Sequence, residues 1–160
     1  MLTRVHTEEV QSAHFCPPPA WSLKAPAKRG RKVEGIRYER KVQAHLGEQS
    51  EHYLASPWII FIVDGRPHWC QPDGLHFDVS NGILTVIEVK YSHTAEAYRQ
   101  LRCVYGPVLA RIFPPKLWTI RLVEVVKWFD PDVRFGEQVT MCPDPLKHAS
   151  ASIGVHIWRP

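Results

Sequence analysis

The order of helix-forming and strand-forming segments predicts a mixed α/β fold of the α+β kind, with a small mixed central sheet flanked by helices. A helical pattern comes first, three strand-like runs follow, and a second helical pattern precedes another strand. This helix-strand-strand-strand-helix-strand order is typical of a sheet covered by helices. The 160 residues fit one domain of ordinary size, and a hydrophobic content of 44% is sufficient for a core.

The first helix is predicted within residues 33–47. Tyr38, Val42 and Leu46 recur at intervals of four residues, which places them on one helix face. Gly47 stands where a helix-terminating residue is expected.

Three strands are predicted next, at residues 58–63, 68–79 and 83–91. The last two are separated by a short polar segment that contains Asn81 and Gly82. Asn-Gly between apolar runs favours a two-residue hairpin loop of type I′, because both loop residues must adopt positive φ.

The second helix is predicted to begin at Thr94, whose hydroxyl suits an N-cap, and to continue through residues 97–108. Pro107 is expected to bend or interrupt it. A further strand is predicted at residues 117–126, and the tail contains one strand-like segment at residues 153–158.

Composition divides the chain into three parts. Residues 1–33 contain three consecutive prolines, at positions 17–19, which exclude a helix or a central strand there. We expect residues 1–33 to form a flexible, Pro-rich basic arm, residues 34–128 to form the core, and residues 129–160 to form a Pro-rich extension.

Basic residues gather before and within the first helix. Between residues 24 and 32 there are five cations and no acid, and the formal net charge of the chain is +4. Such a run is either a solvated tail or a contact for a phosphate backbone, and both interpretations stay open. The candidate nucleic-acid-binding residues are Lys28, Arg29, Arg31, Lys32, Arg37 and Lys41.

Several classes of protein are disfavoured. The longest apolar runs, such as residues 58–63, are too short to span a bilayer, and residues 1–6 do not resemble a signal peptide. The scattered cysteines, without a CxxC pair, indicate reduced thiols, so we expect a cytoplasmic protein without a membrane partner. No Walker A or dinucleotide-binding motif is present, so no nucleotide cofactor is expected.

The predicted hairpin places charged residues on one face. With a two-residue loop, Asp73 lies opposite Lys90 and Leu75 lies opposite Glu88, and directly paired residues share a face. Charges on this otherwise apolar face need a metal, charged partners or water, although a solvated strand end is the alternative interpretation. Two carboxylates suit a hard cation such as Mg²⁺, and a lysine beside them could orient water or stabilise negative charge. This combination favours phosphodiester hydrolysis.

The same residues carry a resemblance to a known family. Pro72-Asp73, fourteen intervening residues and then Glu88-Val89-Lys90 resemble the PD-(D/E)xK nuclease superfamily. Gly35-Ile-Arg-Tyr-Glu39 resembles the GxxxE element of its exonuclease-like branch. The run from Glu39 to Lys90 is also similar to the endonuclease subunit of heteromeric transposases.

The helix after the lysine often carries a glutamine in these families, and Gln100 matches that position. A tyrosine usually follows four residues later, whereas Tyr105 follows after five. The resemblance therefore extends beyond the hairpin, with one departure in spacing.

The resemblance implies a restriction-endonuclease-like core and a metal-dependent DNA endonuclease, of the kind that phages and mobile elements encode. Its cofactor would be Mg²⁺, with Mn²⁺ as a substitute, and its location would be the cytoplasm of a bacterial or phage-infected cell. DNA would be the partner, within a homodimer or a larger nucleoprotein complex. The implied catalytic residues are Glu39, Asp73, Glu88, Lys90 and Gln100, and the implied metal ligands are Asp73, Glu88, Glu39 and the backbone carbonyl of Val89.

One alternative function remains open from the sequence. The chain could be a non-catalytic nucleic-acid-binding or assembly protein that retains the nuclease fold. Among the tryptophans, Trp58, Trp69, Trp118 and Trp128 are expected to pack in the core or on a sheet face rather than to stack on bases.

Overall fold

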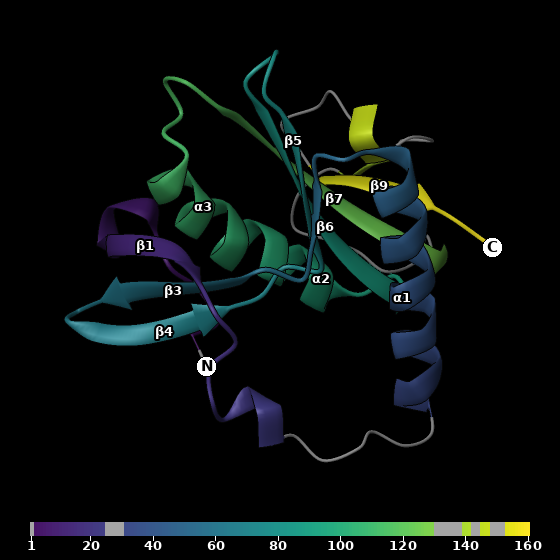
Figure 1. The fold of residues 1–160 in the computed structure, drawn as a ribbon, viewed down its shortest axis with the longest axis horizontal. Coiled ribbons are helices and arrows are strands. Elements are labelled where there is room, and N and C mark those ends of the chain that lie inside the picture. The colour runs from purple at the N-terminus through teal and green to yellow at the C-terminus, as the bar shows by residue number, and fades with distance from the viewer. Residues whose placement is uncertain (1, 25–30, 130–138, 142–144, 148–152) are drawn as a thin grey trace.

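Two β-sheets and the helices between and beside them make up the fold (Figure 1). The computed structural model describes residues 2–24, 31–129, 139–141, 145–147 and 153–160. Within these residues, the larger sheet has the strand order β2-β5-β6-β7-β9-β8. Its strands are β2 (Tyr53–Ala55), β5 (Gly74–Asp78), β6 (Ile83–Ser92), β7 (Thr119–Trp128), β8 (Val139–Met141) and β9 (Ile153–Ile157).

The larger sheet is mixed, as predicted. Strands β2, β5 and β6 are antiparallel neighbours, whereas β6, β7, β9 and β8 run parallel. The smaller sheet is antiparallel, with the order β1-β3-β4, and consists of β1 (Val10–Cys16), β3 (Trp58–Val63) and β4 (Arg66–Cys70).

Helices cover both faces of the larger sheet. Helix α1 (Arg31–Gln49) packs on one face, where Tyr38, Val42 and Leu46 meet the odd-numbered side chains of β6 and β7. This contact confirms the predicted amphipathic stripe. The helix continues two residues beyond Gly47, so that glycine does not end it.

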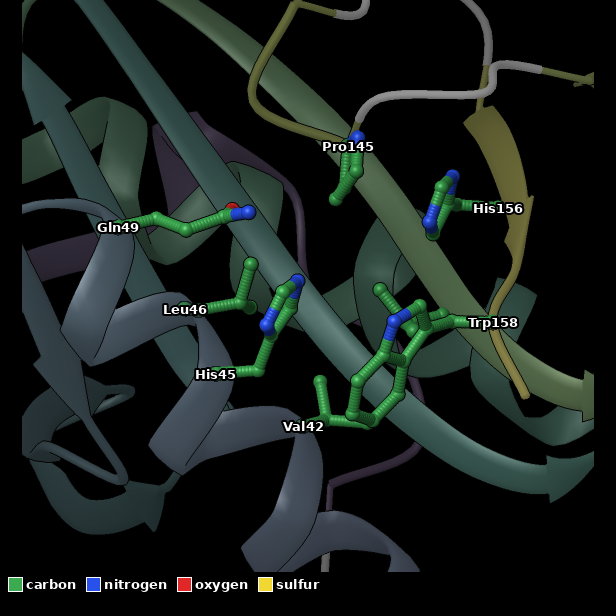
Figure 2. A pocket seen from close by; sticks show the side chains of 8 residues that line it. Val42, His45, Leu46, Gln49, Pro145, His156 and Trp158 are labelled. Carbon is green, nitrogen blue, oxygen red and sulfur yellow. The ribbon is translucent and has the colours of Figure 1, made fainter. Parts of the chain in front are cut away.

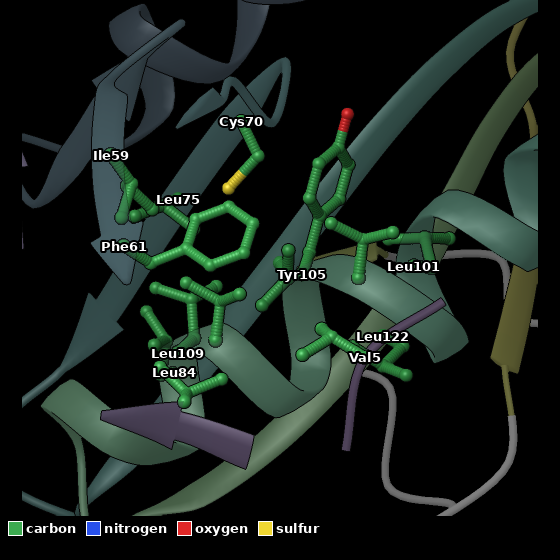
Figure 3. Close-up of a cluster of buried hydrophobic side chains, with 14 of the residues drawn as sticks. Val5, Ile59, Phe61, Cys70, Leu75, Leu84, Leu101, Tyr105, Leu109 and Leu122 are labelled. Carbon is green, nitrogen blue, oxygen red and sulfur yellow. The ribbon is translucent and has the colours of Figure 1, made fainter. Parts of the chain in front are cut away.

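The opposite face carries a second helical layer and then the smaller sheet. This layer consists of α2 (Ala95–Gln100), the π-helical turn η3 (Leu101–Tyr105) and α3 (Gly106–Ile112). Figure 3 shows apolar side chains from both sheets and from this helical layer converging in one buried cluster. Three short 3₁₀ turns complete the described elements: η1 (Thr7–Glu9), η2 (Ser22–Lys24) and η4 (Pro145–Lys147). None of the described helices is long and apolar enough to cross a membrane.

The predicted β5–β6 register is wrong by two residues. The observed pairs are Asp78↔Ile83 and Gly74↔Ile87, so residues 79–82 form a four-residue connection instead of a two-residue loop. Only Gly82 within it has a positive φ, and the Asp78 carboxylate closes the turn by accepting the Asn81 amide hydrogen at 3.1 Å. A shift of two residues preserves the face of every side chain, because the period of a strand is two.

The type I′ signal applies to a different hairpin. Asp64 and Gly65 have φ values of 50° and 69° and join β3 to β4, with Val63 paired to Arg66. The strand predicted at residues 68–79 is in fact two strands in different sheets. The chain leaves β4 after Cys70 and enters β5 at Gly74, and the intervening Pro72 cannot donate to a strand ladder.

The N-terminal segment is not entirely a mobile arm, contrary to expectation. Strand β1 pairs with β3, and Val5 and Val10 are each 2% exposed. The Val5 amide donates to the Cys103 carbonyl at 2.9 Å. That carbonyl would face the nitrogen of Pro107 in an α-helix, and proline has no hydrogen to donate.

The C-terminal segment is likewise more than an extension. Strand β9 lies between β7 and β8 in the larger sheet, and Ile153 and Val155 are buried. The predicted strand at residues 153–158 is therefore confirmed, and it completes the core. Thr94 is confirmed as the N-cap of α2, because its hydroxyl accepts the Ala97 amide hydrogen.

We predict that Gly74→Ala destabilises the protein by about 1–3 kcal/mol, because an added Cβ would overlap the ring of Tyr53. The matched control is Gly35→Ala in α1, where an added Cβ meets nothing within 4 Å. That control should instead stabilise by about 0.5–1 kcal/mol, as expected for glycine to alanine in a helix interior. Urea unfolding of both variants measures the difference, and equal stability of Gly74→Ala and wild type would contradict the close approach.

Candidate active site

Asp73 and Glu88 meet where the chain enters the larger sheet. Continuing the Gly74↔Ile87 register by one residue places Asp73 beside Glu88. The Asp73 carboxylate accepts a 2.7 Å hydrogen bond from the Val89 amide, which fixes it against β6. The metal-binding role predicted for the Val89 carbonyl stays a prediction.

Lys90 is the cation nearest to these acids. Its Nζ lies 2.6 Å from Glu88 Oε1, and its side chain is 24% exposed. Glu88 itself is only 2% exposed, and its Oε2 is buried with no hydrogen-bond partner among the described residues. One oxygen of Glu88 is therefore neutralised by Lys90, and the other lies in the interior without a positively charged partner among the described residues.

Glu39 approaches from α1, on the other side of the sheet. Gln43, one helical turn further along, donates through Nε2 to Glu39 Oε1 at 3.2 Å and to the Asp73 carbonyl at 3.0 Å. The same nitrogen lies 2.7 Å from Ser56 Oγ. Gln43 thus ties the helix to the start of β5. Gln43 is not among the residues predicted from the sequence, although its spacing of four from Glu39 was the available signal.

Burial and mutual repulsion make these carboxyl groups hard to ionise. Burial raises the pKa of Asp73 to about 8, with further increases from Glu88 and Glu39, against the opposing effects of the Val89 amide and Lys90. Burial also raises the pKa of Glu88, although Lys90 opposes it. Burial alone would lower the pKa of Lys90, but the Glu88 carboxylate raises it above its ordinary value. The lysine is therefore charged, and it cannot neutralise every acid around it.

The donor set fits a divalent cation. The buried Oε2 of Glu88 needs a positive partner, and a cation beside Asp73 would favour the ionised form of both acids. The described residues contain no ready-made group of three His, Cys, Asp or Glu ligands. Mg²⁺ is commonly held by one or two carboxylates and several waters, so the two acids are a sufficient protein contribution.

The helical layer adds Gln100 and Tyr105. Gln100 Nε2 donates to the Tyr105 hydroxyl at 3.3 Å, and that hydroxyl donates to the Gln71 carbonyl at 3.1 Å. Burial raises the pKa of Tyr105, and the charges of Glu88 and Asp73 raise it further. The five-residue spacing between Gln100 and Tyr105 matches the π turn η3, in which residues five apart lie on the same side.

A buried acid–histidine pair lies next to the site, and sequence reasoning missed it. Glu124 on β7 is directly opposite Glu88, and its Oε2 lies 2.6 Å from His93 Nδ1. Both side chains are 1% exposed, and burial raises the pKa of Glu124 to about 8. A single Glu inside an apolar strand, Val123-Glu124-Val125, was the available signal.

The predicted nucleic-acid-binding residues are only partly described. Arg37 and Lys41 are exposed on α1. Arg31 and Lys32 begin the same helix, but their side chains are not described, and Lys28 and Arg29 lie outside the described residues. Their contact with DNA stays a prediction.

A cavity of about 250 Å³ lies on the α1 side of the larger sheet (Figure 2). His45 stacks on Trp158 there, with ring centroids 4.8 Å apart. None of the predicted catalytic residues lines it. This cavity is therefore separate from the candidate site.

Comparison with protein-family models, curated proteins and solved structures finds no match to the chain.

We predict that Asp73→Asn flattens the pH dependence of stability in metal-free buffer. The folded protein holds the Asp73 proton up to about pH 8, whereas the ordinary pKa is 3.8. The folded state therefore binds more protons between these values, and wild-type stability should fall as the pH rises through this window. Asparagine cannot ionise, so the variant should lose less stability.

The control for this prediction is Asp78→Asn in the exposed β5–β6 turn. The Asn81 side-chain hydrogen bond lowers the pKa of Asp78, so its contribution is lost only on acidification. Urea unfolding in EDTA at about pH 5 and about pH 9 compares the three proteins. Equal slopes for wild type and Asp73→Asn would show that Asp73 is not held protonated.

Proposed function

We propose that this protein is a divalent-metal-dependent DNA endonuclease that hydrolyses phosphodiester bonds. The observation that carries the proposal is the placement of Asp73 and Lys90 beside the buried carboxylate of Glu88, which Lys90 neutralises only in part. These are the same residues on which the resemblance to PD-(D/E)xK nucleases rests.

Two further features support the proposal. Glu39, on the GxxxE-like element, raises the pKa of Asp73 and is linked to it through Gln43. Gln100 and Tyr105 meet across the π turn despite their unusual spacing. Buried acids that raise each other's pKa reduce stability, so a protein without catalytic function would gain nothing by retaining them.

The chemistry follows from the roles of these side chains. A divalent cation bound by Asp73 and Glu88 would supply Lewis-acid polarisation of a phosphate oxygen and a more acidic water. The ammonium group of Lys90 provides fixed positive charge where negative charge develops on phosphate. The Val89 amide holds the Asp73 carboxylate in place, and Gln43 holds the backbone at Asp73.

We predict that Asp73→Asn, Glu88→Gln and Lys90→Met each reduce DNA cleavage by at least about a hundredfold, because each removes charge from the reacting centre. Nicking of supercoiled plasmid with Mg²⁺ or Mn²⁺ measures the rate. Asp78→Asn and Lys116→Met, both in turns away from the site, are the matched controls and should cut like the wild type. Cleavage by Glu88→Gln at the wild-type rate would reject this site.

Measurements of metal binding should distinguish the role of the two acids from that of the lysine. At about a hundred times its dissociation constant, a divalent ion should stabilise the wild type by about 2.7 kcal/mol. Asp73→Asn and Glu88→Gln should lose most of this gain, whereas Lys90→Met should retain it because it provides no oxygen ligand. Thermal unfolding with Ca²⁺ or Mn²⁺ tests this, and an undiminished gain in Asp73→Asn would contradict the assigned ligands.

A further inference from the structure

A second cavity, of about 690 Å³, lies beside β4 and next to the candidate site. Its size is within the range of about 300–1,000 Å³ typical of ligand pockets. Strand β4 is an edge of the smaller sheet, and the cavity continues from it to the helical layer. Several of the residues lining it are aromatic, and they include Trp21, Trp58, Trp69 and Tyr105.

Three tryptophans form the outer wall of this cavity. Trp21 stands edge to face against Trp58, with ring centroids 5.5 Å apart and an interplanar angle of 89°. It makes a similar contact with Trp69 at 6.5 Å and 84°. Trp21 is 58% exposed, so much of its surface is not used in packing. An exposed aromatic surface that groups with neighbouring rings is typical of an interaction or ligand-binding site.

The inner wall is polar and belongs to the candidate site. Gln71, Gln100 and Tyr105 line the cavity and are joined by the hydrogen bonds of the Tyr105 hydroxyl. Gln100 Oε1 is buried and has no hydrogen-bond partner among the described residues. Gln71 is also only two residues from Asp73 in the chain. The cavity therefore opens beside the candidate site, and its lining combines aromatic rings with amide side chains.

We propose that this aromatic cavity binds an unpaired base of the DNA strand, so that the enzyme acts on DNA containing a single-stranded segment. The inference rests on the proposed function, since it specifies the form of the DNA substrate. An aromatic ring can stack on any unpaired base, and the polar side chains of the lining suit the hydrogen-bonding edge of that base.

A paired base cannot use this cavity, because its faces are already stacked and its hydrogen-bonding edge is occupied. A wholly apolar occupant would displace water from the polar part of the lining without replacing its hydrogen bonds, which is unfavourable. An unpaired base can stack on the aromatic rings and hydrogen-bond to the polar part of the lining.

The test measures binding in EDTA, where cleavage cannot occur. The full-length protein is titrated into an end-labelled single-stranded oligonucleotide and into the duplex that it forms with its complement. Trp21→Ala should weaken single-strand binding roughly 5- to 150-fold and leave duplex binding unchanged, as expected for loss of one stacking ring. Trp21→Phe keeps a ring and should lose much less.

Trp128→Ala is the matched control, because Trp128 is 46% exposed but contacts Lys127 and Arg159 away from the cavity. It should bind both DNAs like the wild type. Wild-type affinity of Trp21→Ala for the single strand, or equal weakening with both DNAs, would overturn the inference. If Trp21 proves dispensable for binding while plasmid nicking still requires Glu88, the inference fails and the proposed function stands. If Trp21-dependent binding occurs but no DNA is cut, the proposed nuclease function fails.

Discussion

Crowding of carboxyl groups around one lysine is the interaction on which the candidate site depends. Glu88 is almost completely buried, and Asp73 and Glu39 lie close enough to raise each other's cost of ionisation. Lys90 offsets one negative charge, and without a cation Asp73 holds its proton up to about pH 8. Buried charge of this kind is expensive in a protein interior, so it is retained where a cation or a charged substrate compensates for it.

The fold maintains this crowding through short, specific contacts. Residues 71–73 connect β4 in one sheet to β5 in the other and belong to neither strand. The Asp73 side chain can therefore accept the Val89 amide hydrogen. Gln43 binds the same point from the opposite face. In the helical layer, the π turn rotates Tyr105 onto Gln100 and toward Gln71. Three separate elements therefore converge on one stretch of three residues.

Much of the site could be predicted from the sequence, because strand parity survives an error in register. The two-residue slip in the β5–β6 pairing left Asp73, Glu88 and Lys90 on one face. The sequence predicts positive φ at Asn81 and Gly82, but only Gly82 has it, because the Asp78 carboxylate stabilises a longer turn there and Asp64-Gly65 forms the tight one. The N-terminal strand β1 was missed, because three prolines follow it and it pairs with β3 more than forty residues away in the chain.

The sequence by itself determined the amphipathic face of α1, the alternation of the central strands and the spacing of the acids and lysine, since these depend on local periodicity. Only the tertiary structure decided that β4 and β5 belong to different sheets, that β9 completes the larger sheet, and that Glu124 lies opposite Glu88. It also brought Trp21 against Trp58 and Trp69. These features are contacts between residues far apart in the chain, and the free energy that selects them comes from joint burial, which a local pattern does not encode.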